Sequence, residues 1–136
     1  MLKKIICVLL FGTSLSAIAS EPTSVAVKQI RQAARDAKEA YESAGLAGLT
    51  VASQYCYESS GHDLYCVDFD VAAAYLDRRF ADAMGINRYD YFDAAQLLER
   101  ARPIFAHARW SKDTSNQYLK FADSVARDEI DGAENP

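Results

Sequence analysis

The sequence predicts an all-α fold, a small antiparallel bundle of four to five helices with one disulfide. Apolar residues recur at steps of three and four along most of the chain, the period of one helical face. The breaks between these stretches are short, and short connections favour antiparallel neighbours. Alanine recurs on every expected inner face, which lets helices approach closely.

Residues 1–19 have the three regions of a secretory signal peptide. A positive head with Lys3 and Lys4 precedes the apolar residues 5–12, and small residues end at Ala19, where we expect cleavage. The apolar run is too short to cross a membrane, which takes roughly 20 apolar residues. We therefore expect a periplasmic or secreted protein with no membrane attachment after cleavage, formed by a single helical domain over residues 20–136.

Cleavage at this point would also set the charge of the mature chain. It removes two of the 15 basic residues and none of the 19 acidic ones, which leaves a net charge of −6. An acidic surface disfavours nucleic acid as a partner and suits a basic protein.

The first expected helix begins after a cap at Thr23 or Ser24 and ends at Gly45. Residues 49–57 could form a strand, but no partner strand is visible, so the sequence predicts a short helix. The apolar face of the first helix consists of Val27, Ile30, Ala34, Ala37, Tyr41 and Ala44.

Asp63 is expected to cap a third helix, which Gly85 closes in the left-handed conformation that glycine adopts most readily. The inner stripe of this helix consists of Phe69, Ala73, Leu76, Phe80, Ala83 and Met84. The sequence predicts that most of its charged residues fall outside that stripe, namely Asp68, Asp70, Asp77, Arg78 and Arg79.

Asp90 is expected to cap the next helix, and residues 114–117 form a capping box for the last one. The acidic tail, residues 128–136, is expected to fray. The predicted inner faces are Phe92, Ala95, Leu98, Ala101, Phe105 and Ala108 in the former helix, and Tyr118, Leu119, Ala122, Val125 and Ala126 in the latter.

Loss of the signal peptide would remove Cys7 and leave Cys56 and Cys66. In an exported chain, two cysteines predict one disulfide. The alternative is a metal site, but the spacing is wrong for a zinc knuckle and no second Cys or His pair accompanies it. We expect a structural clip between two helices.

The sequence contains no cofactor, metal or catalytic motif, so we predict a protein that is not an enzyme and binds no cofactor. Its two histidines, His62 and His107, are expected to be exposed. The acidic pair Asp68 and Asp70 should not converge, because residues two apart on a helix point in different directions.

The residues around the disulfide form a candidate partner-binding corner. Tyrosines near acidic residues are common where proteins bind proteins. The alternative is that these rings cover the ends of the bundle while their hydroxyls reach water. The predicted corner consists of Tyr55, Tyr57, His62, Asp63 and Tyr65.

Residues 118–123 (Tyr-Leu-Lys-Phe-Ala-Asp) and 129–131 (Glu-Ile-Asp) resemble the closing helix of periplasmic immunity proteins that neutralise type VI secretion amidase effectors. The resemblance covers about a tenth of the chain. It implies a small, exported, all-helical protein that is often a homodimer.

Export, the lack of catalytic motifs, the acidic charge and the many tyrosines favour a binding protein. Our first hypothesis is an immunity or inhibitor protein that covers or plugs the cleft of a protein partner, such as a cell-wall-degrading effector. The alternative is an accessory component, assembly factor or chaperone of an envelope secretion or conjugation machine. A remote alternative is a small hydrolase that uses His62 or His107 with a nearby carboxylate.

Overall fold

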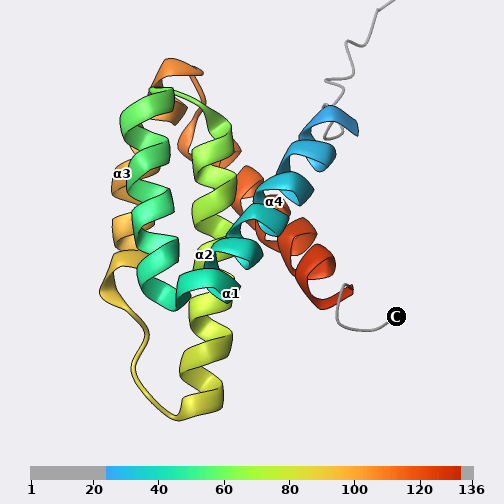
Figure 1. Cartoon of the computed structure of the whole chain (residues 1–136). Coiled ribbons are helices and arrows are strands. Elements are labelled where there is room, and N and C mark those ends of the chain that lie inside the picture. Colours follow the sequence, from blue (N-terminus) through green and yellow to red (C-terminus); the bar gives the residue numbers. More distant parts are fainter. Residues whose placement is uncertain (1–23, 133–136) are drawn as a thin grey trace, which may run out of the picture.

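A computed structural model describes residues 24–132, and within this range the chain is helical and contains no strand (Figure 1). The predicted all-α bundle with one disulfide is confirmed. The predicted signal peptide, residues 1–19, lies outside the described residues. The elements are α1 (Ser24–Ser60), α2 (Leu64–Met84), the short 3₁₀ helix η1 (Asp90–Phe92), α3 (Ala94–His107) and α4 (Lys112–Gly132).

Helix α1 consists of two helical halves joined at a break. Ala44 and Gly45 have non-helical backbone angles there, and Gly45 adopts φ 61° and ψ −151°, a region essentially reserved for glycine. The predicted helix end at Gly45 and the predicted helix over 49–57 are both confirmed. The two halves of α1 approach each other closely at this break. A Cβ atom on Gly48 would lie only 2.5 Å from the carbonyl oxygen of Ala40, so only glycine fits there.

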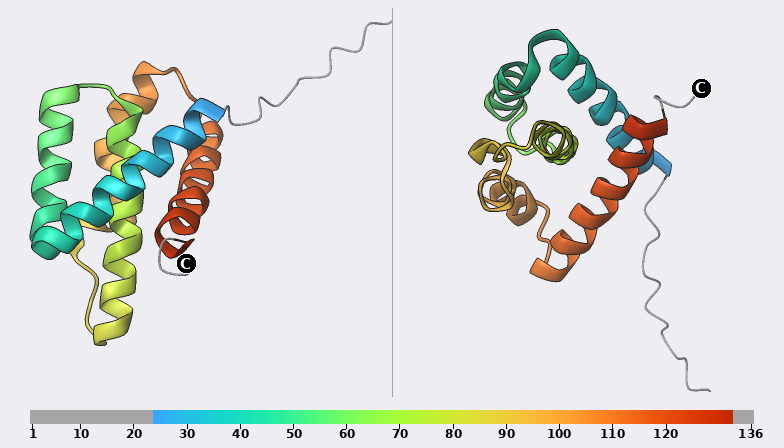
Figure 2. Two further views of the ribbon diagram at one scale, coloured as in Figure 1. Left: turned by 45° about the vertical axis from the view of Figure 1, so that its right-hand side comes forward. Right: turned by 90° about the horizontal axis from the view of Figure 1, so that it is seen from below.

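Helix α2 is the centre of the described bundle, and the other elements surround it (Figure 2). The second half of α1 and helix α3 run antiparallel to α2 on one side. The first half of α1 and helix α4 cross α2 on the other side and pack against each other. Every residue from Cys66 to Ala74 is buried, as expected for a helix with neighbours all round.

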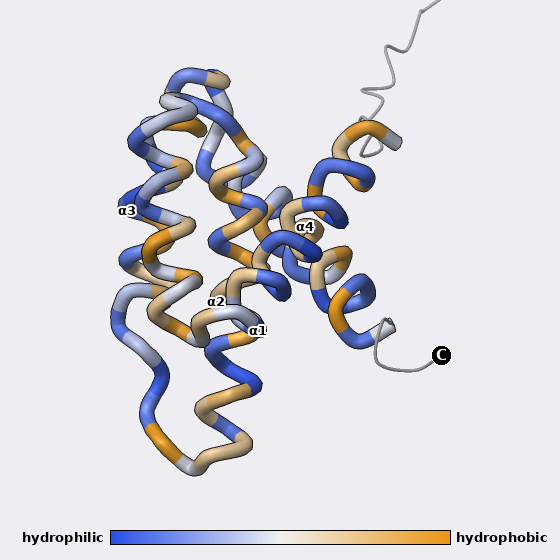
Figure 3. Tube along the Cα trace, in the orientation of Figure 1, coloured by the Kyte–Doolittle hydropathy of each residue, from blue (hydrophilic) through white to orange (hydrophobic). Residues whose placement is uncertain are grey.

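Small and branched apolar side chains fill the core, which lies around α2. In Figure 3 the hydrophobic residues of α1 and α4 alternate with hydrophilic ones, the pattern of helices with one face in water. The fully buried members include Ile30, Ala33, Ala34, Ala37, Leu49, Val67, Ala72, Ala73, Ala101, Ala122 and Ala126.

The prediction that the aspartates of α2 lie outside its buried stripe is wrong. Asp68 and Asp70 are completely buried and Asp77 is 2% exposed. The prediction of a single stripe failed because other helices enclose α2 on several sides from Cys66 to Asp77, whereas its last turn is exposed. Polar residues on such a helix must find partners inside the protein.

The predicted start of the fourth helix is also corrected. Asp90 begins η1, and α3 starts at Ala94 with Asp93 as its cap, whose carboxylate accepts a 2.8 Å hydrogen bond from the Gln96 N–H. The buried face of α3 is correspondingly rotated. Leu97 is buried, whereas Leu98, which we predicted to be inside, is 40% exposed.

Helix α4 begins and ends differently from the prediction. It starts at Lys112, and its cap is Ser111, whose hydroxyl accepts a 3.1 Å hydrogen bond from the Thr114 N–H. The cap therefore lies three residues before Thr114, the first residue of the predicted capping box. It also continues to Gly132 with Ile130 buried, so the predicted fraying is wrong for 128–132. Residues 133–136 lie outside the described range.

None of the helices between residues 24 and 132 is long and apolar enough to span a membrane.

Candidate functional site: the disulfide corner and the exposed apolar loop

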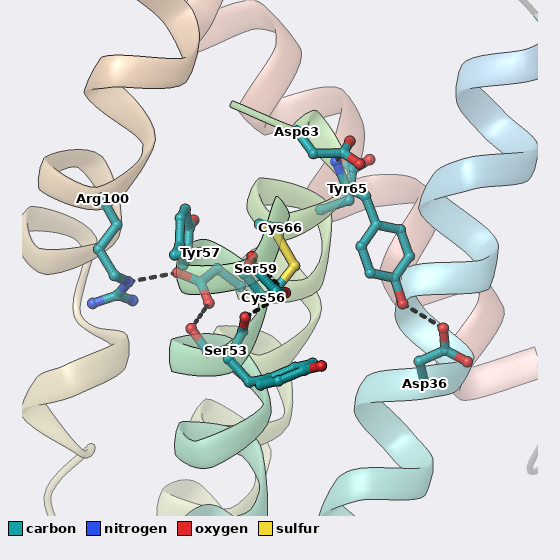
Figure 4. Close-up of a disulfide and its surroundings, with 12 residues drawn as sticks. Asp36, Ser53, Cys56, Tyr57, Ser59, Asp63, Tyr65, Cys66 and Arg100 are labelled. Carbon is teal, nitrogen blue, oxygen red and sulfur yellow. Dashed lines mark hydrogen bonds and ion pairs between the residues drawn. A yellow bond between two sulfur atoms is a disulfide. The ribbon is translucent and has the colours of Figure 1, made fainter. Parts of the chain in front are cut away.

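The predicted disulfide is present between Cys56 and Cys66, with a Cα–Cα distance of 5.6 Å (Figure 4). It ties the last turns of α1 to the first turn of α2. Gly61 turns the chain between them with φ +65°, and the Asp63 carboxylate caps α2 by accepting a 2.9 Å hydrogen bond from the Tyr65 N–H. The disulfide suits an oxidising compartment.

The five residues of the predicted corner lie near the disulfide but point in different directions. The Tyr57 hydroxyl donates a 3.2 Å hydrogen bond to Asp70, toward the interior, and the Tyr65 hydroxyl donates to Asp36 on the first half of α1 (Figure 4). Tyr55, in contrast, is 70% exposed. Burial and the neighbouring carboxylates raise the pKa of both the Tyr57 and the Tyr65 hydroxyl, so each remains a neutral donor.

Asp70 is the centre of a buried polar cluster that the sequence did not reveal. Its carboxylate accepts hydrogen bonds from the Ser53 hydroxyl at 2.5 Å and from the Arg100 Nε at 2.7 Å. The Tyr91 hydroxyl lies 3.0 Å from the Ser53 hydroxyl, and the Arg100 guanidinium lies 3.9 Å from the centre of the Tyr91 ring. Burial raises the pKa of Asp70, and the positive charge of Arg100 opposes that shift.

This cluster joins four elements: α1, α2, η1 and α3. Ser53 is completely buried, so a substrate could not reach its hydroxyl without unfolding of the site. Within residues 24–132, the Arg100 Nη2 atom is buried without a hydrogen-bond partner, and the Tyr91 ring face beneath the guanidinium is its main compensation. The geometry fits a structural role for the cluster.

Asp68 forms a second buried cluster, on the opposite side of α2. It accepts hydrogen bonds from the Tyr118 hydroxyl of α4 at 2.7 Å and from the Gln29 amide of α1 at 3.0 Å. Burial raises the pKa of Asp68 to about 6, although both hydrogen bonds act in the opposite direction. Asp68 and Asp70 therefore hold different neighbours, which confirms that the pair does not converge.

The loop between α2 and η1, residues 85–89, and the residue before it carry exposed apolar side chains. Met84, which we predicted to lie on the inner stripe of α2, is instead 62% exposed, and Ile86 and Tyr89 of the loop are 53% and 45% exposed. The loop lies at the far end of α2 from the disulfide, where it projects beyond the rest of the bundle (Figure 1). The apolar residues on either side of the predicted helix end at Gly85, Met84 and Ile86, were the available sequence signal.

Both ends of this loop are fixed by hydrogen bonds. Gly85 takes the predicted left-handed cap, with φ 64°, and the Ile86 N–H donates to the Ala81 carbonyl at 3.1 Å. The Tyr89 N–H donates to both oxygens of the buried Asp77 carboxylate, at 3.1 and 3.2 Å. Hydrogen bonds to α2 therefore hold both ends of the loop in place.

An apolar cleft of about 280 Å³ lies beside this loop, between α3 and α4 over the surface of α2. Its base is formed by Val71, Ala74, Phe92 and Leu97, and Arg88 of the loop stands at its edge. Arg88 therefore connects the loop with the cleft. Its other lining residues are Arg78, Asp93, Ala94, Leu98, Asn116, Leu119 and Asp123.

The two histidines are both exposed, as predicted, and the structure brings them together. The ring centres of His62 and His107 lie 4.7 Å apart, and the ring planes differ by 14°. No cluster of three or more His, Cys, Asp or Glu residues able to hold a metal ion occurs in the part of the chain that the structure describes.

Comparisons of this chain with protein-family models, with curated proteins and with solved structures give no match.

Proposed function

We propose that this protein is an exported helical binding protein, an immunity or inhibitor protein that neutralises a protein partner such as a cell-wall-degrading effector. The observation that carries the proposal is the projecting loop 85–89, whose exposed Ile86 is accompanied by Met84 and Tyr89. Clustered exposed apolar side chains commonly mark protein-binding sites. The predicted signal peptide and the resemblance of residues 118–123 to periplasmic immunity proteins support the export and the inhibitory role.

The shape of the surface suits inhibition by insertion. A loop held at Gly85 and at Tyr89 loses little conformational freedom when it binds, which favours affinity. Apolar side chains on a projecting loop can enter a partner's cleft and become the buried centre of the interface. The cleft beside Arg88 can accept a side chain of the partner in return.

Affinity capture with single substitutions tests the proposal. The mature protein, with its disulfide formed, is used to capture a partner from an extract of its own cells, and the partner is identified and purified. We expect Ile86→Asp to weaken this complex at least tenfold, because the new charge must be buried in the interface. Val25→Asp is the matched control, since Val25 is 72% exposed and belongs to the first turn of α1, and the start of α1 lies away from the loop (Figure 1).

Activity of the captured partner then separates immunity from assembly. If the partner hydrolyses cell-wall material, wild-type protein should inhibit it and the Ile86→Asp variant should not. A partner without such activity, belonging to an envelope machine, would favour the assembly role. Equal affinity of wild type and Ile86→Asp would contradict the loop as the binding surface.

A further inference from the structure

The chain has two histidines in its whole sequence, and the fold places them face to face. His62 lies in the turn between α1 and α2, and His107 is the last residue of α3. They come from segments 45 residues apart, and neither belongs to the buried clusters around Asp68 and Asp70. Their contact therefore calls for an explanation outside the packing of the core.

Both imidazole rings are carried by well-held backbone. The turn that contains His62 is closed by the Cys56–Cys66 disulfide and by the Asp63 cap. After His107, the Trp110 N–H donates a 3.0 Å hydrogen bond to the Phe105 carbonyl, and the two rings stack at 5.6 Å. These contacts hold the backbone at both histidines, while the exposed side chains are not held by them.

The surroundings of the pair favour a cation. His62 and His107 line a shallow depression together with Gln29, Ser60 and Asp63, while no lysine or arginine of the described chain lines it. The charge of Asp63 also acts on the nearby Asp68 and raises the pKa of that carboxyl, so two acidic groups lie close to this depression. Local negative charge attracts a positive ion.

We propose that His62 and His107 form a two-histidine surface site for a divalent transition-metal ion such as Zn²⁺ or Ni²⁺. Imidazole nitrogen is a preferred ligand of both ions. Two nitrogens on one tetrahedral zinc ion lie about 3.4 Å apart, given Zn–N bonds near 2.05 Å. The nitrogen lone pairs lie in the ring planes, so the stacked rings, which are 14° from parallel, must rotate about their side-chain bonds before two nitrogens point at one ion.

Water completes the coordination, because within residues 24–132 no third His, Cys, Asp or Glu is placed to join the pair. A bound ion would link the disulfide turn to the end of α3. Since a ligand that binds only the folded state stabilises it, the metal would raise the thermal stability of the protein. This role is independent of the loop at the other end of α2.

Calorimetric titration of the mature, disulfide-bonded protein with ZnCl₂, and separately with NiCl₂, tests the site, using protein without a histidine tag. We expect saturable binding of one ion per chain at pH 7.5, reversed by a chelator. His62→Ala and His107→Ala should each weaken binding at least tenfold. Asp113→Ala, which removes an exposed carboxylate outside the depression, is the control and should bind as wild type does.

Nuclear magnetic resonance of the imidazole groups gives a second readout. Zinc should shift the signals of both rings with the same concentration dependence. A shift of one ring alone, or affinity retained in either single variant, would overturn the proposal, as would the absence of saturable binding. These outcomes do not depend on whether the loop 85–89 binds a protein.

Discussion

The buried aspartates are the residues on which the packing of α2 depends. Asp68 holds α1 and α4 through Gln29 and Tyr118, whereas Asp70 holds Ser53 on α1 and Arg100 on α3. Asp77 fixes the end of the loop 85–89. A buried carboxylate is costly unless it is hydrogen-bonded, so the loss of one partner should be far more damaging than the loss of an exposed charge.

Arg100→Met tests the Asp70 cluster. The substitution keeps an unbranched side chain of similar length but leaves a completely buried carboxylate without its cation. We expect the free energy of unfolding to fall by about 3–5 kcal/mol, measured by urea denaturation. The control is Arg102→Met, two residues further along α3, which removes an exposed ion pair with Glu99 and should cost less than about 1 kcal/mol. Similar losses in both variants would contradict a special role for Asp70.

Asp68 makes stability depend on pH. Its pKa is about 6 in the folded protein, above its ordinary value, so the folded state binds the proton more tightly than the unfolded state. The stabilisation by this proton is complete below pH 4 and is lost as the pH rises through 6. A pKa raised by about two units corresponds to a change of at most about 3 kcal/mol in the free energy of unfolding.

Asp68→Asn removes this dependence, because the amide is neutral at every pH and can still accept the Tyr118 hydrogen bond. We expect the stability of wild type relative to this variant to fall between pH 4 and pH 7, measured by urea denaturation across that range. Asp82→Asn, an exposed position on the same helix, is the control. A difference between wild type and Asp68→Asn that does not change with pH would refute the assignment.

At the scale of elements, the sequence correctly predicted that each α-helix exists. It did not correctly predict which residues several of these helices bury or at which residues they begin and end. The periodic pattern predicted the helices because burial on one side leaves a clear signal, as in α1 with Ile30 and Ala34. It failed for α2, which neighbours enclose on several sides. It also placed the starts of α3 and α4 several residues away, because Asp90 and Asp93, or Ser111 and Thr114, are equally good capping residues.

The candidate site shows the same division. The disulfide and the Asp63 cap were predictable because they depend on residues close in the sequence. The directions of Tyr57 and Tyr65 were not, because their partners Asp70 and Asp36 are set by the packing of helices. The contact between His62 and His107 likewise follows only from the position of α3.

The break in α1 offers a test at this scale. Gly45→Ala places a side chain at φ +61° with open space around it, so its expected cost of about 1–3 kcal/mol is backbone strain. Gly48→Ala has ordinary backbone angles, but its Cβ would clash with the Ala40 carbonyl oxygen, at a cost of about 1–3 kcal/mol. Thermal denaturation measures both. Gly132→Ala has neither problem and should be close to neutral, and two unaffected midpoints would contradict this account of the break.

In the whole molecule, the disulfide and the loop 85–89 lie at opposite ends of α2. This helix has 21 residues, so about 30 Å separates its ends. The two features can therefore be tested independently of each other, and the predicted corner around Cys56 and Cys66 can be compared directly with the loop as a binding surface.

Replacement of both cysteines by serine should lower the free energy of unfolding by about 3 kcal/mol, since the loop that the disulfide closes is short. Urea denaturation checks this value. At a temperature where the variant stays folded, its affinity for the captured partner should equal that of wild type. Weaker binding by a folded variant would instead identify the disulfide corner as the binding surface.

The enclosure of α2 has a consequence for how the fold selects one arrangement. A helix with a single wet face has its rotation about its own axis set by that face, but a helix covered on several sides by alanine-rich neighbours could be turned at little cost. Asp68 and Asp70 remove this freedom, because their carboxylates meet donors on the neighbouring helices at one angle of rotation only. These two aspartates thus fix the rotation of α2 about its own axis among the helices that surround it.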